Sequence, residues 1–121
     1  KVPVLRGWTA VEAKFGHANW YHIINTHLEV YASSKDAQNA QARELLLAID
    51  SKKDLPVILV GDFNSQDMKD DAYEIIIDAG YEDVWADQTD FGWTCCHNDT
   101  LKGPDSYSLR IDYIFSSAGN L

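Results

Sequence analysis

The chain has 121 residues, enough for one domain, and its 45% hydrophobic and 24% charged residues exclude wholesale disorder. No apolar run approaches the length of a membrane span, so we expect a soluble chain. The 19 acidic and 10 basic residues give a formal net charge of −9, which argues against a surface that coats nucleic acid. This negative charge is compatible with a protein that binds anionic ligands through bound cations. From charge alone, however, an acidic surface that only keeps the protein soluble is the simpler explanation.

The N-terminal third predicts strands. A short apolar run covers residues 2–5, and hydrophobic alternation over 8–15 is followed by a turn at 16–19 and a returning strand at 20–28. In the returning strand alternate residues point to opposite faces, Ile24, Thr26 and Leu28 to one and Ile23, Asn25 and His27 to the other.

A helix and a buried strand come next. Ser33 and Asp36 have the spacing of a capping box, and an apolar stripe follows, made of Ala42, Leu45, Leu46 and Ile49. The continuous apolar run 57–60 predicts a strand that is covered on both faces, and Gly61 lets the backbone turn as it leaves the sheet.

The C-terminal part predicts one more helix and one more strand. Asp67 is the expected helix cap, Gly80 the stop, and the apolar stripe between them is Ala72, Ile75, Ile76 and Ala79. Residues 81–108 are expected to be mostly loop, and 110–115 the last strand. The neighbouring cysteines, Cys95 and Cys96, are not expected to bridge each other. Strands alternating with helices indicate an α/β layer structure with a mixed sheet.

The strongest local signal for a site is Gly61-Asp62-Phe63-Asn64, at the carboxyl end of the buried strand. Sites in open α/β sheets form outside the carboxyl ends of strands. A carboxylate and a carboxamide that face the same way suit a hard cation or a phosphate, and Phe63 is then directed into the core. An ordinary strand-to-loop turn, where Asp and Asn are common, is the competing interpretation.

Two weaker signals lie on the neighbouring strands. His27, in Asn25-Thr26-His27-Leu28-Glu29, can donate a hydrogen bond to phosphate or act as an acid or base, although a structural histidine is the more frequent case. Asp112 interrupts an apolar strand, where an ionised carboxylate needs a partner. It either pairs with Arg110 or flanks a site.

Taken together, NTHLE, GDFN and RIDYIF on successive strands resemble the endonuclease/exonuclease/phosphatase superfamily, the DNase I-like group. The segment 6–8, the helix with Gln41, and Gly92–Cys96 with Asp99 and Leu101 look like a bacterial branch of it. The resemblance implies an α/β (α+β) layered sandwich, half of a DNase I-like four-layer fold with a mixed β-sheet and helices on one face.

The resemblance extends over residues 1–121 and implies the C-terminal half of a family domain. The N-terminal half, with its metal-binding Glu, and the terminal S-D-H motif do not occur in these residues. It also implies roles for four side chains. Asp62 orients or deprotonates the attacking water, Asn64 holds a phosphate oxygen or the metal, His27 hydrogen-bonds a non-bridging oxygen, and Asp112 orients the histidine of the missing motif. Asp62 and Asn64 would be ligands of Mg²⁺ or Mn²⁺.

The implied function is a metal-dependent hydrolase of phosphoester bonds, with in-line attack of water on phosphorus. The alternative is a non-catalytic half-domain that acts in assembly or phosphate binding. The acidic composition favours a small or lipid-like phosphoester over duplex DNA. An apolar sheet face with Ile24, Leu28, Ile58 and Val60 predicts a homodimer, or a complementing N-terminal half. The compartment is unknown, although the bacterial branch suggests a secreted or periplasmic protein.

Overall fold

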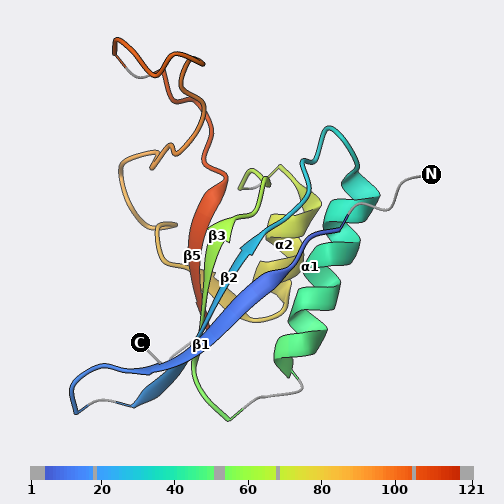
Figure 1. The fold of residues 1–121 in the computed structure, drawn as a ribbon, viewed down its shortest axis with the longest axis vertical. Coiled ribbons are helices and arrows are strands. Elements are labelled where there is room, and N and C mark those ends of the chain that lie inside the picture. The colour runs from blue at the N-terminus through green and yellow to red at the C-terminus, as the bar shows by residue number, and fades with distance from the viewer. Residues whose placement is uncertain (1–4, 18, 51–53, 68, 105, 118–121) are drawn as a thin grey trace.

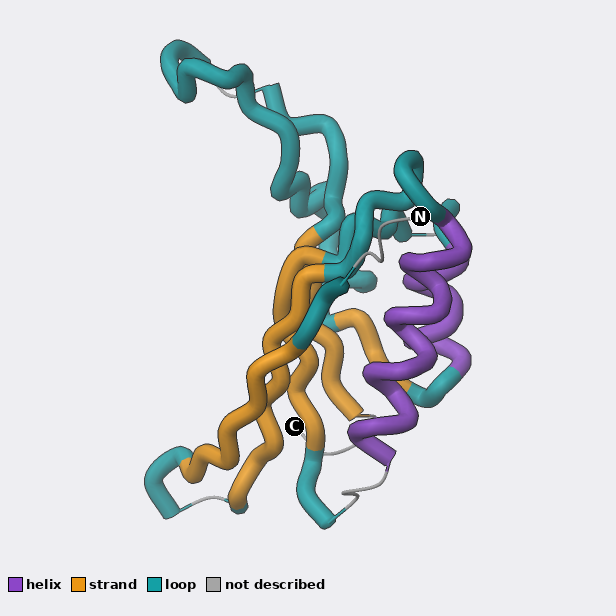
Figure 2. Tube along the Cα trace, turned by 45° about the vertical axis from the view of Figure 1, so that its right-hand side comes forward, coloured by secondary structure: helices purple, strands orange, loops and turns teal. Residues whose placement is uncertain are grey.

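The computed structural model describes residues 5–17, 19–50, 54–67, 69–104 and 106–117. The strands are β1 (Trp8–Lys14), β2 (Trp20–His27), β3 (Val57–Asp62), β4 (Tyr81–Asp83) and β5 (Asp112–Ser117), and the helices are α1 (Lys35–Asp50) and α2 (Asp71–Asp78). The strands form one sheet in the order β1-β2-β3-β5-β4, with both helices on one face (Figures 1 and 2). This confirms the predicted α/β class, with a mixed sheet and helices on one face.

The sheet is mixed because of how its strands are connected. β1 and β2 form an antiparallel hairpin, whereas β2 and β3 pair in parallel, as strands joined through a helix such as α1 can. β5 then pairs antiparallel with both β3 and β4. The strands β2, β3 and β5 are therefore neighbours, which brings the three sequence motifs to one part of the sheet.

The hydrophobic core lies between the sheet and the two helices. Its fully buried members come from both layers and include Ile24, Leu28, Leu45, Leu59, Phe63, Ile76 and Phe115. Phe63 is directed into this core, as predicted, and its ring meets the ring of Phe115 edge-on at 5.1 Å between centroids. The predicted α1 stripe is confirmed, with Leu46 only partly buried. Within the described residues, no helix is long and apolar enough to cross a membrane.

The starts of both helices differ from the prediction. In α1 the hydroxyl of Ser34, and not of Ser33, accepts a hydrogen bond from the Ala37 amide at 3.3 Å. In α2 the N-cap is Asp70, and the Ser65 hydroxyl accepts a hydrogen bond from the Tyr73 amide of the first turn. Asp67 is not the cap because α2 begins only at Asp71; its carboxylate binds Arg110, at 3.0 Å.

Other boundaries also differ. The region 81–108 contains the short strand β4, which the loop prediction missed, and an isolated bridge between Cys95 and Leu109. The segment between those two residues projects from the body of the molecule (Figure 1). Cys95 and Cys96 form a disulfide with each other, contrary to expectation. Ala79, predicted to lie on the α2 stripe, is the exposed C-cap. Of the predicted strand at 2–5, residues 2–4 lie outside the described residues.

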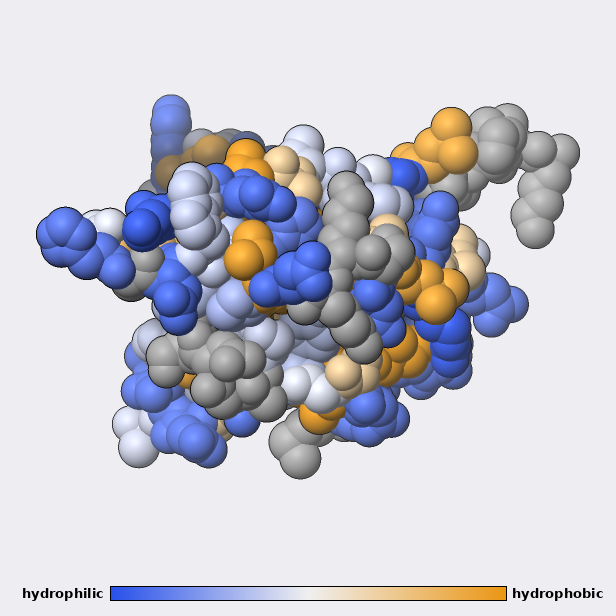
Figure 3. All heavy atoms as spheres, turned by 90° about the horizontal axis from the view of Figure 1, so that it is seen from below, coloured by the Kyte–Doolittle hydropathy of each residue, from blue (hydrophilic) through white to orange (hydrophobic). Residues whose placement is uncertain are grey.

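The face of the sheet opposite the helices carries exposed apolar side chains, and we call it the open face. Register pairs and strand alternation place the following residues on it: Val11, Ile23, Ile58, Val60 and Ile114. Val11 is 58% exposed and Ile114 is 52% exposed. Ile24 and Leu28 were wrongly predicted on this face, since both are buried beneath the helices. Seen from the end of the sheet, hydrophobic residues also reach the surface in separate groups (Figure 3).

Candidate active site

Three of the predicted site residues lie in one row across the sheet. His27 is the register partner of Asp62 in the parallel pair β2–β3, and Asp62 is the register partner of Asp112 in the antiparallel pair β3–β5. Directly opposed residues point to the same face, with Cβ atoms about 4.5–5.5 Å apart in antiparallel pairs. The sheet therefore gathers an imidazole and two carboxylates at one end of the open face.

Asp62 is the central member of this row, and both of its carboxylate oxygens have neighbours. Oδ1 accepts a hydrogen bond from the Asn64 amide at 2.9 Å, and Oδ2 lies 3.5 Å from Nε2 of His27. Burial raises the pKa of Asp62 above its usual value, the Asn64 hydrogen bond lowers it, and the Asp112 carboxylate raises it further. Asp62 is thus a partly desolvated acid beside a second acid.

Asn64 lies just beyond the end of β3 in the left-handed backbone region, with φ +49°. Its Nδ2 donates a hydrogen bond to the carbonyl oxygen of Leu28 at 2.9 Å, which attaches the loop after β3 to the end of β2. This bond turns the amide nitrogen toward the protein. The oxygen Oδ1 is the part of the side chain that remains for a ligand.

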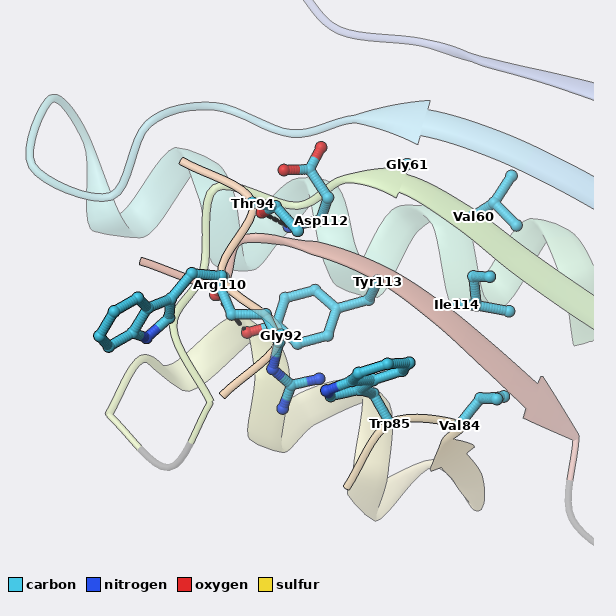
Figure 4. Close-up of a pocket in the computed structure, with 11 residues that line it drawn as sticks. Val60, Gly61, Val84, Trp85, Gly92, Thr94, Arg110, Asp112, Tyr113 and Ile114 are labelled. Atoms are coloured by element: carbon cyan, nitrogen blue, oxygen red, sulfur yellow. Dashed lines mark hydrogen bonds between the residues drawn. The ribbon is translucent and has the colours of Figure 1, made fainter. Parts of the chain in front are cut away.

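Asp112 begins β5 and is exposed. The hydroxyl of Thr94 accepts a hydrogen bond from the Asp112 amide at 3.2 Å, and Figure 4 shows Thr94 beside Asp112. The predicted alternative, a pair between Asp112 and Arg110, is not what the structure has. Arg110 precedes the strand, and its guanidinium binds Asp67 and Asp83 instead.

Two cavities flank the row. One, of about 500 Å³, is bordered by His27 and Asp62 together with Gly7 to Thr9. The other, of about 560 Å³, is bordered by Asp112, Thr94, Trp85 and Trp93. Figure 4 shows the indole of Trp85 on this side of β5. Gly92 lies against Trp85, where a Cβ would collide with the indole. The acidic row is therefore open to ligands from both sides.

The donor set at the row suits a hard divalent cation. Within the described residues, no group of three His, Cys, Asp or Glu side chains is arranged to hold a metal ion. However, Mg²⁺ commonly binds through one or two carboxylates and completes its shell with water and phosphate oxygens. The Asp62 carboxylate and the Asn64 carboxamide oxygen are such ligands, and a cation would offset the repulsion between Asp62 and Asp112.

Sequence reasoning missed three residues around the row. Thr94 supports the start of β5, Arg6 forms an ion pair with Glu29 at 3.3 Å, and Gln38 contacts the loop of Asn64 from below. Gln38 had a detectable signal, because this polar residue precedes Ala42 by four positions on the apolar stripe of α1. Arg6 and Thr94 lie in segments that carry the family resemblance, 6–8 and Gly92–Cys96, but no local pattern in those segments indicated their contacts.

Comparison with known proteins places the chain in a family. The model of the endonuclease/exonuclease/phosphatase family matches residues 2–121, and the chain belongs to this family. No curated protein sequence matches it significantly.

Solved structures match the fold closely, at low sequence identity. An endonuclease/exonuclease/phosphatase family protein from Bacteroides thetaiotaomicron matches with a TM-score of 0.69 and 23% identity, over 92% of this chain and 40% of that one. A mannosyl-6-phosphatase from the same species matches with a TM-score of 0.65 and 23% identity, over 83% of this chain and 38% of that one. The catalytic domain of human Nocturnin matches with a TM-score of 0.64 and 20% identity, over 92% of this chain and 40% of that one. The chain thus spans about two fifths of the length of these structures.

Proposed function

We propose that the protein acts on phosphoesters as a metal-dependent hydrolase, with Asp62 and His27 as its central catalytic residues. The observation that carries this proposal is the row of His27, Asp62 and Asp112, with Oδ2 of Asp62 and Nε2 of His27 3.5 Å apart at the edge of a cavity. Membership in a family that includes nucleases and phosphatases supports it. The matched structures are more than twice as long, which is consistent with our proposal that the chain represents the C-terminal half of such a domain.

The proposed reaction uses the side chains of this row in distinct roles. Asp62 orients a water molecule and accepts its proton as the oxygen attacks phosphorus, while the bond to the leaving oxygen breaks on the opposite side. Nε2 of His27 donates a hydrogen bond to a non-bridging oxygen, where negative charge develops. In a longer chain that contains the S-D-H motif, Asp112 would orient its histidine, whereas the other roles belong to residues of this chain.

Asp62 and Oδ1 of Asn64 would hold Mg²⁺ or Mn²⁺, with Asp112 adding negative potential beside them. When bound, the cation polarises the phosphate and stabilises charge on the leaving oxygen. The net charge of −9 disfavours a long polyanion and favours a small or lipid-like phosphoester. The match to a mannosyl-6-phosphatase is consistent with a small substrate.

We expect the purified chain to hydrolyse bis-p-nitrophenyl phosphate in Mg²⁺ or Mn²⁺. Removal of the metal with EDTA should reduce the release of p-nitrophenol to the rate of buffer alone, and excess metal should restore it. No turnover with any divalent metal would contradict the proposal and favour the alternative, a non-catalytic half-domain in assembly or phosphate binding.

The open face is the proposed assembly surface. Apolar side chains of β1 and β5 are exposed there and those of β3 are partly buried, and contiguous patches of this kind mark interaction sites. The matched structures contain more than half of their residues outside the matched part, so a complementing N-terminal half would cover this face in a longer protein. In the chain of 121 residues, a second copy is the available partner, which makes a two-fold homodimer the expected state.

This assembly is testable by light scattering coupled to size exclusion. We expect a dimer for the chain, and a shift to the monomer when a charge is placed on the open face by Val11→Asp or Ile114→Asp. Leu47→Asp is the matched control, because Leu47 is 71% exposed on α1, on the other side of the molecule. A monodisperse monomer at high concentration would contradict the homodimer.

A further inference from the structure

Gln38 is a polar side chain that is fully buried, with 0% exposure. It lies on the core side of α1, on the same stripe as Ala42 and Leu45. An amide in an apolar environment is costly unless it is hydrogen-bonded. Its contacts therefore show what this position requires.

The nitrogen Nε2 of Gln38 donates to carbonyl oxygens of two different loops. It lies 2.8 Å from the oxygen of Glu29, in the loop after β2, and 2.7 Å from that of Asn64, in the loop after β3. A longer contact of 3.3 Å reaches the oxygen of Phe63. His27 and Asp62 each lie two residues before a contacted position, so one amide joins the two loops that follow the candidate site residues.

The orientation of this amide follows from its surroundings. The oxygen Oε1 is also buried, and within the described part of the chain it has no hydrogen-bond partner. In the reversed orientation, Oε1 would face the carbonyl oxygens of Glu29, Phe63 and Asn64 and gain only repulsion. The surrounding carbonyl oxygens therefore require a hydrogen-bond donor at this position, and the acceptor atom Oε1 of Gln38 is not used.

Asn64 is the residue whose backbone this contact supports. Its φ of +49° is uncommon for a residue with a side chain, although asparagine adopts it more readily than most. Two hydrogen bonds hold Asn64 from the sheet side, to Asp62 and to Leu28. Gln38 holds the carbonyl of the same residue from the helix side.

We propose that Gln38 is a positioning residue, which fixes the backbone of Asn64 and thereby the placement of Asp62 and Asn64 toward a ligand. This assignment rests on the proposed function only where it concerns turnover. The conformation of Asn64 can be measured independently of activity. Gln38 acts through the loop and does not itself touch the substrate.

Gln41, one turn further along α1, provides a matched control. Its Oε1 accepts a hydrogen bond from the Glu29 amide at 2.8 Å. It therefore holds the loop after β2, and no hydrogen bond in the described residues joins its side chain to Asn64. If any hydrogen bond from α1 to these loops were enough to hold Asn64, substitutions of Gln38 and of Gln41 would change the conformation of Asn64 equally.

The test compares Gln38→Leu, Gln38→Glu and Gln41→Leu with the unchanged chain by NMR. In Gln38→Leu we expect the Asn64 amide to exchange with solvent at least about tenfold faster, and its carbon shifts to lose their left-handed signature. Gln41→Leu should leave both unchanged. In Gln38→Glu the ionised side chain offers the carbonyl oxygens no donor, whereas its protonated form regains one. Relative to the unchanged chain at the same pH, the left-handed carbon shifts of Asn64 should therefore return as the pH falls.

Kinetics add a second measurement. Gln38→Leu should lower kcat for bis-p-nitrophenyl phosphate at least about tenfold with a smaller change in KM, because misplaced groups fail mainly in the transition state. Unchanged Asn64 exchange and shifts in both Gln38 variants would overturn the inference, whatever their activity. If the unchanged chain has no turnover, only the proposed function fails. If Gln38→Leu does not fold, the pH response of Gln38→Glu decides.

Discussion

Asp62→Asn should lower the rate of phosphodiester hydrolysis by at least about 100-fold, the lower end of what a general base contributes. The variant keeps an oxygen that can accept the Asn64 amide hydrogen bond, so the loop geometry remains. The variant loses the carboxylate that accepts the proton of the attacking water and that would bind the metal as an anion. Initial rates in saturating Mn²⁺ measure the effect.

The control is Asp78→Asn, which removes an exposed carboxylate at the end of α2. It changes the net charge equally and should leave the rate within about twofold, because surface charges far from a site are screened. Hydrolysis by Asp62→Asn at the unchanged rate would remove Asp62 from the reaction.

The raised pKa of Asp62 gives the same variant a pH signature. In the metal-free protein this shift links stability to pH. A folded-state pKa above the unfolded one means that the folded protein binds the proton more tightly. The free energy of unfolding, relative to Asp62→Asn, should therefore fall as pH rises from 3.8 through the folded-state pKa. Urea titrations of both proteins across this range measure the difference.

Arg110→Leu is expected to cost about 3–5 kcal/mol of unfolding free energy, a large part of the stability of a typical domain. The guanidinium lies 2.7 Å from the carboxylate of Asp83, and these side chains are only 7% and 1% exposed. Removal of the cation leaves a buried carboxylate with the hydroxyl of Tyr73 and the amide of Trp85 as its donors. Burial, and then the Asp83 charge, raise the pKa of Tyr73 to about 12, so this hydroxyl keeps its proton at neutral pH.

The double variant Arg110→Leu with Asp83→Leu separates the charge from the packing. Replacement of a whole buried ion pair by apolar residues often costs little, so the double variant should recover much of the loss. Urea unfolding of the unchanged chain, both single variants and the double variant gives the four free energies of a double-mutant cycle. A cost below about 1 kcal/mol for Arg110→Leu would show that water reaches Asp83 and solvates it.

Sequence patterns predicted the elements with strong periodicity. The stripe of α1, the strand at β3 and the alternation of β2 each depend on local spacing, and each was found. The prediction that β3 is covered on both faces was wrong, because Ile58 and Val60 lie on the open face and are only partly buried. The three-residue strand β4 was missed because so short an edge strand has too few residues to show a period. The predicted helix caps were wrong because each helix begins further along the chain than its cap signal, with Ser34 in place of Ser33 and Asp70 in place of Asp67.

The candidate site was predictable in part. His27, Asp62 and Asp112 were identified from motifs, and the register of β2, β3 and β5 places them in one row. The idea that Arg110 pairs with Asp112 failed, because it assumed a strand that begins at Arg110, whereas β5 begins at Asp112. The contacts of Gln38 and Thr94 join segments that are distant in sequence, and no local sequence pattern predicts such contacts.

Gly61 sets the spacing within the row. It pairs with Thr26, has φ +140°, and leaves no room for a Cβ, which would collide with the carbonyl oxygen of Thr26. The two main chains thus meet directly, one position before His27 and Asp62. The separation of the two strands at this point, and with it the starting distance between imidazole and carboxylate, therefore depends on main-chain hydrogen bonding and contact and not on the size of an intervening side chain.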